Sequence, residues 1–305
     1  MPLSARDYTH PKYWPAWLTI GFIRLVATPP WQVQKGLARL LSLVLYYLAR
    51  QRRHIVEVNL RLCFPEWDEA TRRQKVKDVI YNNALGFIET ANGYYLPPEK
   101  LRSMVQVSGL DTLEKAIAQG RGVLLLGAHY SHLDFGGTLL AQYAPVHAIY
   151  RPHNNPLMDW FIRNNRLKFM SGMLARRDMR GIARALKNNA VVWYPPDQDY
   201  GSKHSVYAPF FGVNAATITA TSRLAKLNHS PVLTISYRRD NGRQHYFLEI
   251  ERLETEFPSG DDVDDAATIN RAIENLIRRA PTQYMWTHRR FKTQPNQKTK
   301  ASLYK

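Results

Sequence analysis

Apolar and polar residues alternate in blocks from residue 105 onward, and the blocks predict strands and helices in turn. Short apolar runs of strand length occupy residues 105–107, 122–127, 146–150, 190–194, 232–238 and 246–250. Segments with helical periodicity occupy residues 111–119, 133–142, 155–168, 178–187, 215–227 and 263–279. Strands that alternate with helices are typical of βαβ units, so we predict an α/β fold in which helices flank a mostly parallel central sheet.

The region before residue 105 is predicted to be helical. Its first apolar segment, residues 13–31, is about as long as a bilayer is thick and has tryptophans near both ends. Arg24 lies within it, and a second apolar segment at residues 37–49 is followed by three arginines within residues 50–53. This pattern favours a helical membrane anchor over two core helices of a soluble domain. Spanning and surface attachment both stay open.

Residues 55–94 are predicted to form two helices that are interrupted at Cys63-Phe64-Pro65. Asp68 is the expected cap of the second helix. Glu89 lies in the apolar continuation of that helix, where it could line a pocket or, on the alternative interpretation, face solvent.

Composition adds a strong positive charge to this picture. The chain has 305 residues, with 42 Lys and Arg against 25 Asp and Glu, which gives a net charge of +17. Nucleic acid, an anionic membrane or an acidic carrier protein could each balance this charge. We find no nucleic-acid-binding module such as a zinc finger, so nucleic acid is not an expected partner. The single cysteine, Cys63, excludes an internal disulfide and a cysteine metal cluster.

The most informative stretch is GVLLLGAHYSHLDFGG, from Gly122 to Gly137. A buried strand leads into a loop that carries His129, and Asp134 follows five residues later at the expected start of a helix. Side chains five apart differ by about 140° around a helix, so the two meet only if His129 lies in the loop. Asp134 could then accept the Nδ1 proton of His129 and leave Nε2 to take a proton from a hydroxyl. The alternative is an ordinary polar loop with a carboxylate at a helix N-terminus.

Another candidate site follows the strand at residues 146–150. Parallel strands end at one edge of a sheet, where ligands gather, so residues after this strand are expected near His129. Arg151 comes first and suits bidentate binding of a phosphate or carboxylate. Asn154 and Asn155 turn the chain into the next helix, which carries Arg166 and whose free N–H groups add an anion site. Arg176, Arg177 and Arg180 are expected to form a solvated basic face.

The strand at residues 190–194 ends in PPDQDYG, which contains Asp197, Asp199 and Tyr200. The two carboxylates could bind a metal, orient Arg151 or position a sugar hydroxyl. No further ligands stand at metal-binding spacing, so we predict no metal. The HxxH spacing of His129 and His132 lacks the other elements of a zinc site, and His132 is expected to be a bystander. Residues 208–212 form an apolar loop that could line an acyl pocket or pack in the core.

Several motifs together carry a family resemblance. They are the HxxxxD of His129 to Asp134 and the segments NLRLCFPEW, GRGVLLLGAH, YRPHNNPLMDW, VVWYPPDQDYG, APFFGV and THRRFKTQP. In this combination the chain resembles the late acyltransferases of lipid A biosynthesis, the lauroyl/palmitoleoyl branch of the lysophospholipid-acyltransferase-like superfamily. The similarity runs from His10 to Tyr304.

The resemblance implies an enzyme at the cytoplasmic face of the cell inner membrane, attached through its N-terminal segment. It would take a fatty acyl chain from acyl carrier protein and place it on the 3-hydroxyl of an acyl chain of a Kdo-bearing lipid A precursor, an anionic glycolipid, without a metal or other cofactor. The alternative acceptor is a lysophospholipid or another glycolipid. A non-catalytic basic protein would explain the charge but leave the HxxxxD motif unexplained.

The resemblance also implies roles for residues and a division of the chain. His129 and Asp134 match the catalytic dyad of the family. We expect membrane-associated helices at residues 1–50 and an acyltransferase catalytic domain at residues 51–305. The expected substrate-binding residues are Arg151, Asn154, Asn155, Arg166, Asp197, Asp199 and Tyr200.

Overall fold

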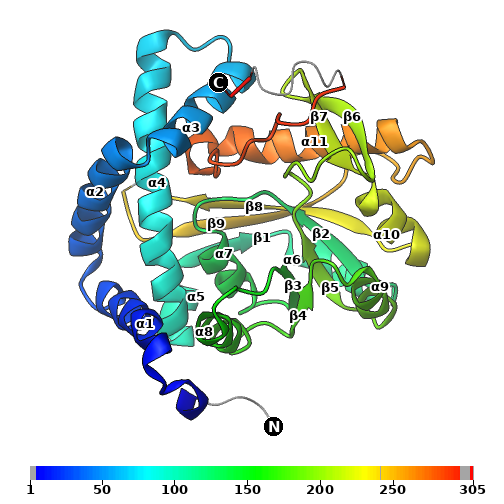
Figure 1. The fold of residues 1–305 in the computed structure, drawn as a ribbon. Coiled ribbons are helices and arrows are strands. Elements are labelled where there is room, and N and C mark those ends of the chain that lie inside the picture. The colour runs from blue at the N-terminus through cyan, green and yellow to red at the C-terminus, as the bar shows by residue number, and fades with distance from the viewer. Residues whose placement is uncertain (1–4, 241, 296–302, 305) are drawn as a thin grey trace.

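A seven-stranded sheet lies at the centre of the molecule and helices surround it (Figure 1). The computed structural model describes residues 5–240, 242–295 and 303–304. The order of the strands in the sheet is β1-β9-β8-β2-β5-β3-β4, and β6 and β7 form a separate hairpin. The strands are β1 (Val105–Ser108), β2 (Val123–Gly127), β3 (Val146–Tyr150), β4 (Gly172–Ala175), β5 (Val191–Tyr194), β6 (Ser205–Phe210), β7 (Val213–Ile218), β8 (Val232–Arg239) and β9 (Tyr246–Arg252).

The pairing of the strands confirms the predicted mostly parallel sheet. β8 and β9 pair antiparallel, and the other pairs of the seven-stranded sheet are parallel. β2 lies between β5 and β8, and the side chains of Val123 to Leu126 are fully buried. An uninterrupted apolar run suits this central position because both faces of the strand are covered. The parallel register brings the carboxyl ends of β2, β5 and β3 to one edge.

Helices cover both faces of the sheet and extend to one side of it (Figure 1). α1 and α2 lie beside the long helix α4 on the left of Figure 1, whereas α9 and α10 lie on the right. The helices are α1 (Trp14–Ala27), α2 (Trp31–Leu48), α3 (Arg50–Cys63), α4 (Glu69–Tyr95), α5 (Pro98–Ser103), α6 (Leu110–Ile117), α7 (Leu133–Leu140), α8 (Pro156–Arg166), α9 (Met179–Lys187), α10 (Ala220–Asn228) and α11 (Asp262–Arg279).

Most predicted elements are present, and their caps show why they begin where they do. Asp68 accepts a hydrogen bond of 2.7 Å from the backbone N–H of Thr71, which confirms it as the cap of α4. The helix predicted at residues 111–119 is present as α6, but Asp111 does not cap it. α6 begins one residue earlier, at Leu110, after Gly109 in the left-handed conformation, and Asp111 lies in its first turn.

The predicted helix at residues 215–227 is wrong in its first half. Residues Val213–Ile218 form β7, which pairs antiparallel with β6, and helix α10 begins only at Ala220. β-branched residues such as Thr217 fit this pleated surface better than a helix. The hairpin also takes in the apolar segment 208–212. Phe210 and Phe211 belong to the hydrophobic core, which confirms the core-packing interpretation of that segment.

α1 and α2 expose large apolar side chains along their length. Their exposed fractions range from 37% at Leu37 to 79% at Leu48. The chain breaks between the two helices at Pro29-Pro30, so the apolar segment of residues 13–31 is not one continuous helix. Within the described ranges, no helix combines the length and hydropathy that crossing a bilayer requires. The exposed residues are Trp14, Leu18, Phe22, Leu25, Val33, Leu37, Leu40, Leu43, Val44, Tyr47 and Leu48.

A pair of buried amides fastens α2 to α4. The side chains of Gln34 and Asn92 donate to each other at 3.0 and 2.9 Å, and both residues are almost fully buried. Gln34 also donates to the carbonyl oxygens of Val26 and Ala27 at the end of α1. These bonds leave the C-terminal end of α1, the start of α2 and the last turn of α4 fixed relative to one another.

A buried ion pair joins α4 to the sheet. Glu89 accepts from Arg239 of β8 at 2.7 Å and from the hydroxyl of Tyr246 at 2.5 Å, while Asn82 accepts from the second nitrogen of Arg239. Glu89 is fully buried, so neither expected environment, a pocket wall or a solvated face, is right. The apolar part of α4 packs on the sheet, and Arg239 of the sheet provides a positive charge beside Glu89. Burial of the Glu89 carboxylate depends on that partner.

We predict that Glu89→Ala destabilises the fold strongly, by about 3–5 kcal/mol, because it leaves Arg239 buried without its counter-charge. Urea unfolding followed by circular dichroism measures this change. The matched control is Glu69→Ala, which removes an exposed pair with Arg73 at 2.6 Å and should change stability little. Similar unfolding midpoints for the two variants would contradict the structural role of the Glu89–Arg239 pair.

Candidate active site

His129 and Asp197 meet at the carboxyl edge of the sheet. His129 follows β2 and Asp197 follows β5, which are adjacent parallel strands. The Nδ1 atom of His129 lies 2.6 Å from Oδ1 of Asp197, and the backbone N–H of His129 donates to Oδ2 at 2.9 Å. One carboxylate therefore holds both the loop and the ring. It fixes the proton on Nδ1 and leaves Nε2 as the ring nitrogen that can take a proton.

The electrostatics of this pair favour a charged carboxylate. Burial alone would raise the pKa of Asp197, but the positive charge of His129 and the hydrogen bonds from its ring and backbone outweigh burial and lower the pKa to about 2. Asp197 therefore stays ionised near neutral pH. An ionised carboxylate at Nδ1 stabilises the imidazolium that forms when Nε2 accepts a proton.

The predicted hydrogen bond between Asp134 and His129 is wrong. Asp134 lies in the first turn of α7, and its two carboxylate oxygens lie 2.6 and 2.8 Å from Nη2 of Arg166 on α8. The hydroxyl of Tyr94 donates to the same carboxylate at 3.5 Å. Nδ1 of His129 instead contacts Asp197, which follows the neighbouring strand β5. Asp134 pairs with Arg166 of α8.

The loop between β2 and α7 is packed tightly against α4. The backbone carbonyl of Ser131 lies so close to Gly86 of α4 that a Cβ atom at Gly86 would collide with it. Close approach of this kind requires glycine. On the other side, the backbone oxygen of His129 accepts from Met285 at 2.8 Å, and Ser131 donates to Gln283 at 2.8 Å. The position of His129 is thus fixed from both sides.

A large open cavity of about 1510 Å³ contains His129 and Asp134 on its wall. Four of the expected substrate-binding residues also line it: Arg151, Arg166, Asp199 and Tyr200. Asn154 and Asn155 are not among the described lining residues. Asn155 instead caps α8, because its side-chain oxygen accepts from the backbone N–H groups of Leu157 and Met158 at 3.0 and 3.2 Å.

Asp199 connects the site to the C-terminal segment. Its carboxylate accepts from the backbone and hydroxyl of Thr293 at 2.8 and 2.9 Å and from the backbone of Gly201 at 2.8 Å. Thr293 is buried in this contact, so the described part of the chain after Phe291 is held against the site. Residues 296–302 and 305 lie outside the described residues.

His288 is a residue of the cavity that sequence reasoning missed. Its ring centroid lies 5.9 Å from that of His129, and its Nε2 atom lies 3.1 Å from the amide nitrogen of Gln198. Burial, and then the charge of His129, lower the pKa of His288 to about 4, so it is neutral near pH 7. The motif THRRFKTQP contained this histidine, but nothing in its spacing indicated that it faces His129.

The cavity wall is also strongly basic. Arg176, Arg177 and Arg180 are exposed, as expected for a solvated face, but they line the cavity as well. Arg52, from the basic cluster at residues 50–53, and Arg223, which the sequence did not single out, also contribute to the wall. Within the part of the chain that the structure describes, no group of three or more His, Cys, Asp or Glu residues is placed to hold a metal ion. Anionic substrates fit this wall.

The chain matches the model of the bacterial lipid A biosynthesis acyltransferases over residues 1–293. It belongs to this family. It is 37% identical over 292 residues to a lipid A biosynthesis palmitoleoyltransferase of Escherichia coli K12, with 95% of each chain covered. It is 37% identical over 296 residues to a lauroyltransferase of the same strain, with 97% of each chain covered. A lipid A biosynthesis acyltransferase of Haemophilus influenzae Rd is 32% identical over 308 residues, which cover 100% of this chain and 98% of the relative.

The family predicted from the motifs is therefore confirmed, and the chain is an acyltransferase of lipid A biosynthesis. The HxxxxD motif of this acyltransferase brings its two residues onto one cavity wall without joining them. The carboxylate that contacts His129 is that of Asp197, which follows strand β5.

His132 makes the folding stability of this acyltransferase sensitive to acid. The residue is fully buried between α4 and the sheet, and burial lowers its pKa from 6.5 to about 4. As pH falls below 6.5, the unfolded chain binds a proton here and the folded protein does not, so stability decreases. We predict that His132 contributes about 2 kcal/mol to this decrease between pH 7.5 and pH 5.

The measurement is urea unfolding of the wild type and of His132→Gln at both pH values. The variant should lose less stability than the wild type over this interval, whatever its stability at pH 7.5. His229→Asn is the control, because His229 is exposed and its left-handed backbone suits asparagine. An equal pH dependence for His132→Gln and the wild type would refute the assignment.

Proposed function

We propose that the protein transfers a fatty acyl chain from acyl carrier protein to a 3-hydroxyacyl chain of a Kdo-bearing lipid A precursor. The observation that carries this proposal is the His129–Asp197 pair at the wall of a cavity of about 1510 Å³, in a chain of an acyltransferase family. A cavity of this size can accept hydrocarbon chains beside polar groups.

His129 acts as the general base in this proposal. Its Nε2 atom takes the proton of the acceptor hydroxyl while the hydroxyl oxygen attacks the thioester carbon. The new C–O bond forms a tetrahedral intermediate, and collapse of that intermediate breaks the C–S bond. The leaving sulfur takes the proton back from His129, which restores the neutral ring. Asp197 stabilises the charged ring between the two steps.

The assignment of the base to His129 rests on its contrast with His288. Both rings face one cavity, and their centroids lie 5.9 Å apart. A pKa of about 4 makes His288 a weak base near neutral pH, and among the described residues no carboxylate lies within 4.0 Å of its ring nitrogens. A buried carboxylate does hold the ring of His129. General-base catalysis favours the histidine with this support.

Arg166 and Arg151 are proposed to bind the anionic groups of the acceptor. Arg166 is held by Asp134 on the cavity wall, and Arg151 lies exposed at the end of β3. Guanidinium groups suit the phosphates and carboxylates of such a glycolipid because they donate in parallel pairs. Asp134 therefore has a positioning role for Arg166 in this proposal.

We also propose that the protein acts at the cytoplasmic face of the inner membrane, with α1 and α2 attached to the bilayer and residues 51–305 forming the catalytic domain. The exposed apolar side chains of these two helices support surface attachment, because soluble monomers rarely expose so continuous an apolar patch. Lys35, Arg39 and Arg50 lie on or beside the second helix, where they can contact anionic lipid.

The first test of the mechanism compares three variants. Asp197→Asn should lower kcat by about 10³–10⁴-fold, because the amide no longer stabilises the imidazolium or fixes its tautomer. His129→Ala should be at least as damaging. Transfer of a radiolabelled acyl chain from acyl carrier protein to a Kdo-bearing tetraacyl acceptor measures both.

Asp134→Asn serves as the comparison for this test, because it keeps the size of the side chain and weakens its pairing with Arg166. We expect its main effect to be an increase in the KM for the acceptor. If Asp134→Asn lowers kcat as much as Asp197→Asn does, the assignment of Asp197 as the orienting carboxylate is wrong. Intact secondary structure of each variant is checked by circular dichroism.

The test of membrane attachment uses the exposed leucines. The double variant Leu18→Asp/Leu40→Asp places charge on α1 and α2, whose leucines are 76% and 62% exposed. Its binding to vesicles that contain anionic lipid should weaken by about tenfold or more, since burial of apolar area drives attachment. Val263→Asp, on α11, is the control with an exposed apolar residue elsewhere. Unchanged flotation of the double variant with vesicles would refute attachment through these helices.

A further inference from the structure

A dense positive charge covers the surface formed by α9, α10 and the loop before α9. The segment from Arg176 to Lys187 contains five basic residues and one acidic residue, Asp178. Asp178 accepts from the backbone N–H of Gly181 at 2.8 Å and so serves as the cap of α9. We call this surface the basic face. Its exposed residues are Arg176, Arg177, Arg180, Arg184, Lys187, Arg223 and Lys226.

The charge of the basic face is largely unbalanced. In the described part of the chain, Arg223 is the member of the face with a carboxylate within 4.0 Å, and that contact, with Asp262, is 3.8 Å long. By comparison, the exposed residues Arg73 and Lys115 each pair with a carboxylate one turn away on the same helix, at 2.6 and 3.1 Å. A concentration of unpaired like charges suits an acidic partner.

The basic face continues into the cavity that holds His129. Arg176, Arg177, Arg180 and Arg223 line that cavity at its α9–α10 side. Apolar side chains line the same part of the wall, among them Met179, Ala183, Leu224 and Leu227. The wall thus places cationic side chains beside apolar ones, of which Leu224 is buried and Met179 and Leu227 are exposed. It suits a group that is anionic at one end and carries a largely uncharged chain.

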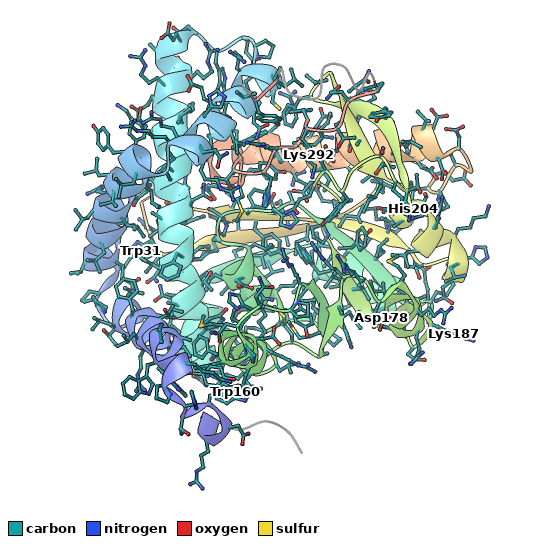
Figure 2. All side chains as sticks on the ribbon, in the orientation of Figure 1. Trp31, Trp160, Asp178, Lys187, His204 and Lys292 are labelled. Carbon is teal, nitrogen blue, oxygen red and sulfur yellow. The ribbon has the colours of Figure 1, made fainter. Side chains whose placement is uncertain are left out.

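The basic face lies on the opposite side of the molecule from the apolar helices α1 and α2. Figure 1 shows α9 and α10 on the right and α1 and α2 on the left, with the sheet between them. Figure 2 shows Lys187 and Trp31 on these two sides. A bilayer in contact with α1 and α2 therefore leaves the basic face accessible to a partner in solution.

We propose that the basic face docks the acyl-loaded carrier protein, an acidic protein that carries its acyl chain as a thioester on a flexible arm with a phosphate at its base. Arg184 and Lys187 contact acidic residues of the carrier. The arginines at the cavity rim pair with the phosphate, and the arm follows the apolar wall toward His129. This inference rests on the proposed carrier-dependent reaction.

The experiment compares two donors that carry the same acyl chain, acyl carrier protein and free pantetheine. Arg184→Glu/Lys187→Glu reverses two charges of the basic face that do not line the cavity. The KM for the acyl carrier should rise by about tenfold or more with kcat nearly retained, while the rate with the pantetheine thioester changes by less than about twofold. In the wild type, added salt should lower kcat/KM for the carrier more steeply than in the variant.

The matched control is Lys77→Glu/Lys100→Glu, which reverses two exposed charges on α4 and α5. It should leave the KM for the carrier unchanged. Docking at the basic face is refuted if the two double variants behave alike, or if the first one loses activity equally with both donors. It is also refuted if Arg184→Glu/Lys187→Glu weakens binding to anionic vesicles and leaves the KM for the carrier unchanged. A wild type that uses the pantetheine thioester and not the carrier instead contradicts the proposed donor itself.

Discussion

The carboxylate of Asp197 is the constraint on which the site depends. It lies fully buried at the end of β5 and accepts from both the ring and the backbone of His129 at the end of β2. A buried charge is tolerated only when such partners surround it. The loop therefore cannot move away from β5 without leaving a carboxylate unpaired. The same contact that orients the ring of His129 also joins the segments that follow β2 and β5.

The general position of the site could be predicted from the sequence. An apolar run such as that of β2 identifies a central strand, and parallel strands bring the residues that follow them to one edge. His129, Arg151 and Asp199 were located by this reasoning, and all three line one cavity. The edge of a parallel sheet is a property of the fold class, so it needs no knowledge of which strands are neighbours.

The partners within the site could not be predicted in the same way. Whether Asp134 or Asp197 reaches His129 depends on the order of the strands, and Asp197 is 68 residues from His129 in the chain. Glu89 finds Arg239 across 150 residues, so its burial was invisible in the local pattern of α4. Residues 215–219, mostly alanine and threonine, fit a helix or a strand equally well. Pairing with β6 makes residues 215–218 a strand. Side-chain contacts that depend on the order of the strands leave no signal in the local sequence.

The molecule is polarised along the direction that runs across the sheet. Apolar side chains are exposed on α1 and α2 at one side, and several arginines line the cavity on the α9–α10 side. Such a distribution separates an apolar surface from a charged one. In the proposed function, the apolar surface contacts the bilayer and the charged surface contacts the carrier protein.

The amide pair of Gln34 and Asn92 has a consequence for how the enzyme can be divided. Deletion of the first two helices would remove the partner of Asn92, which is almost fully buried in α4, and expose the apolar side of that helix. The same helix carries Gly86, whose backbone touches the loop of His129. Removal of these helices would therefore disturb the support of the loop that carries His129. In this fold the N-terminal helices are part of the scaffold that positions His129.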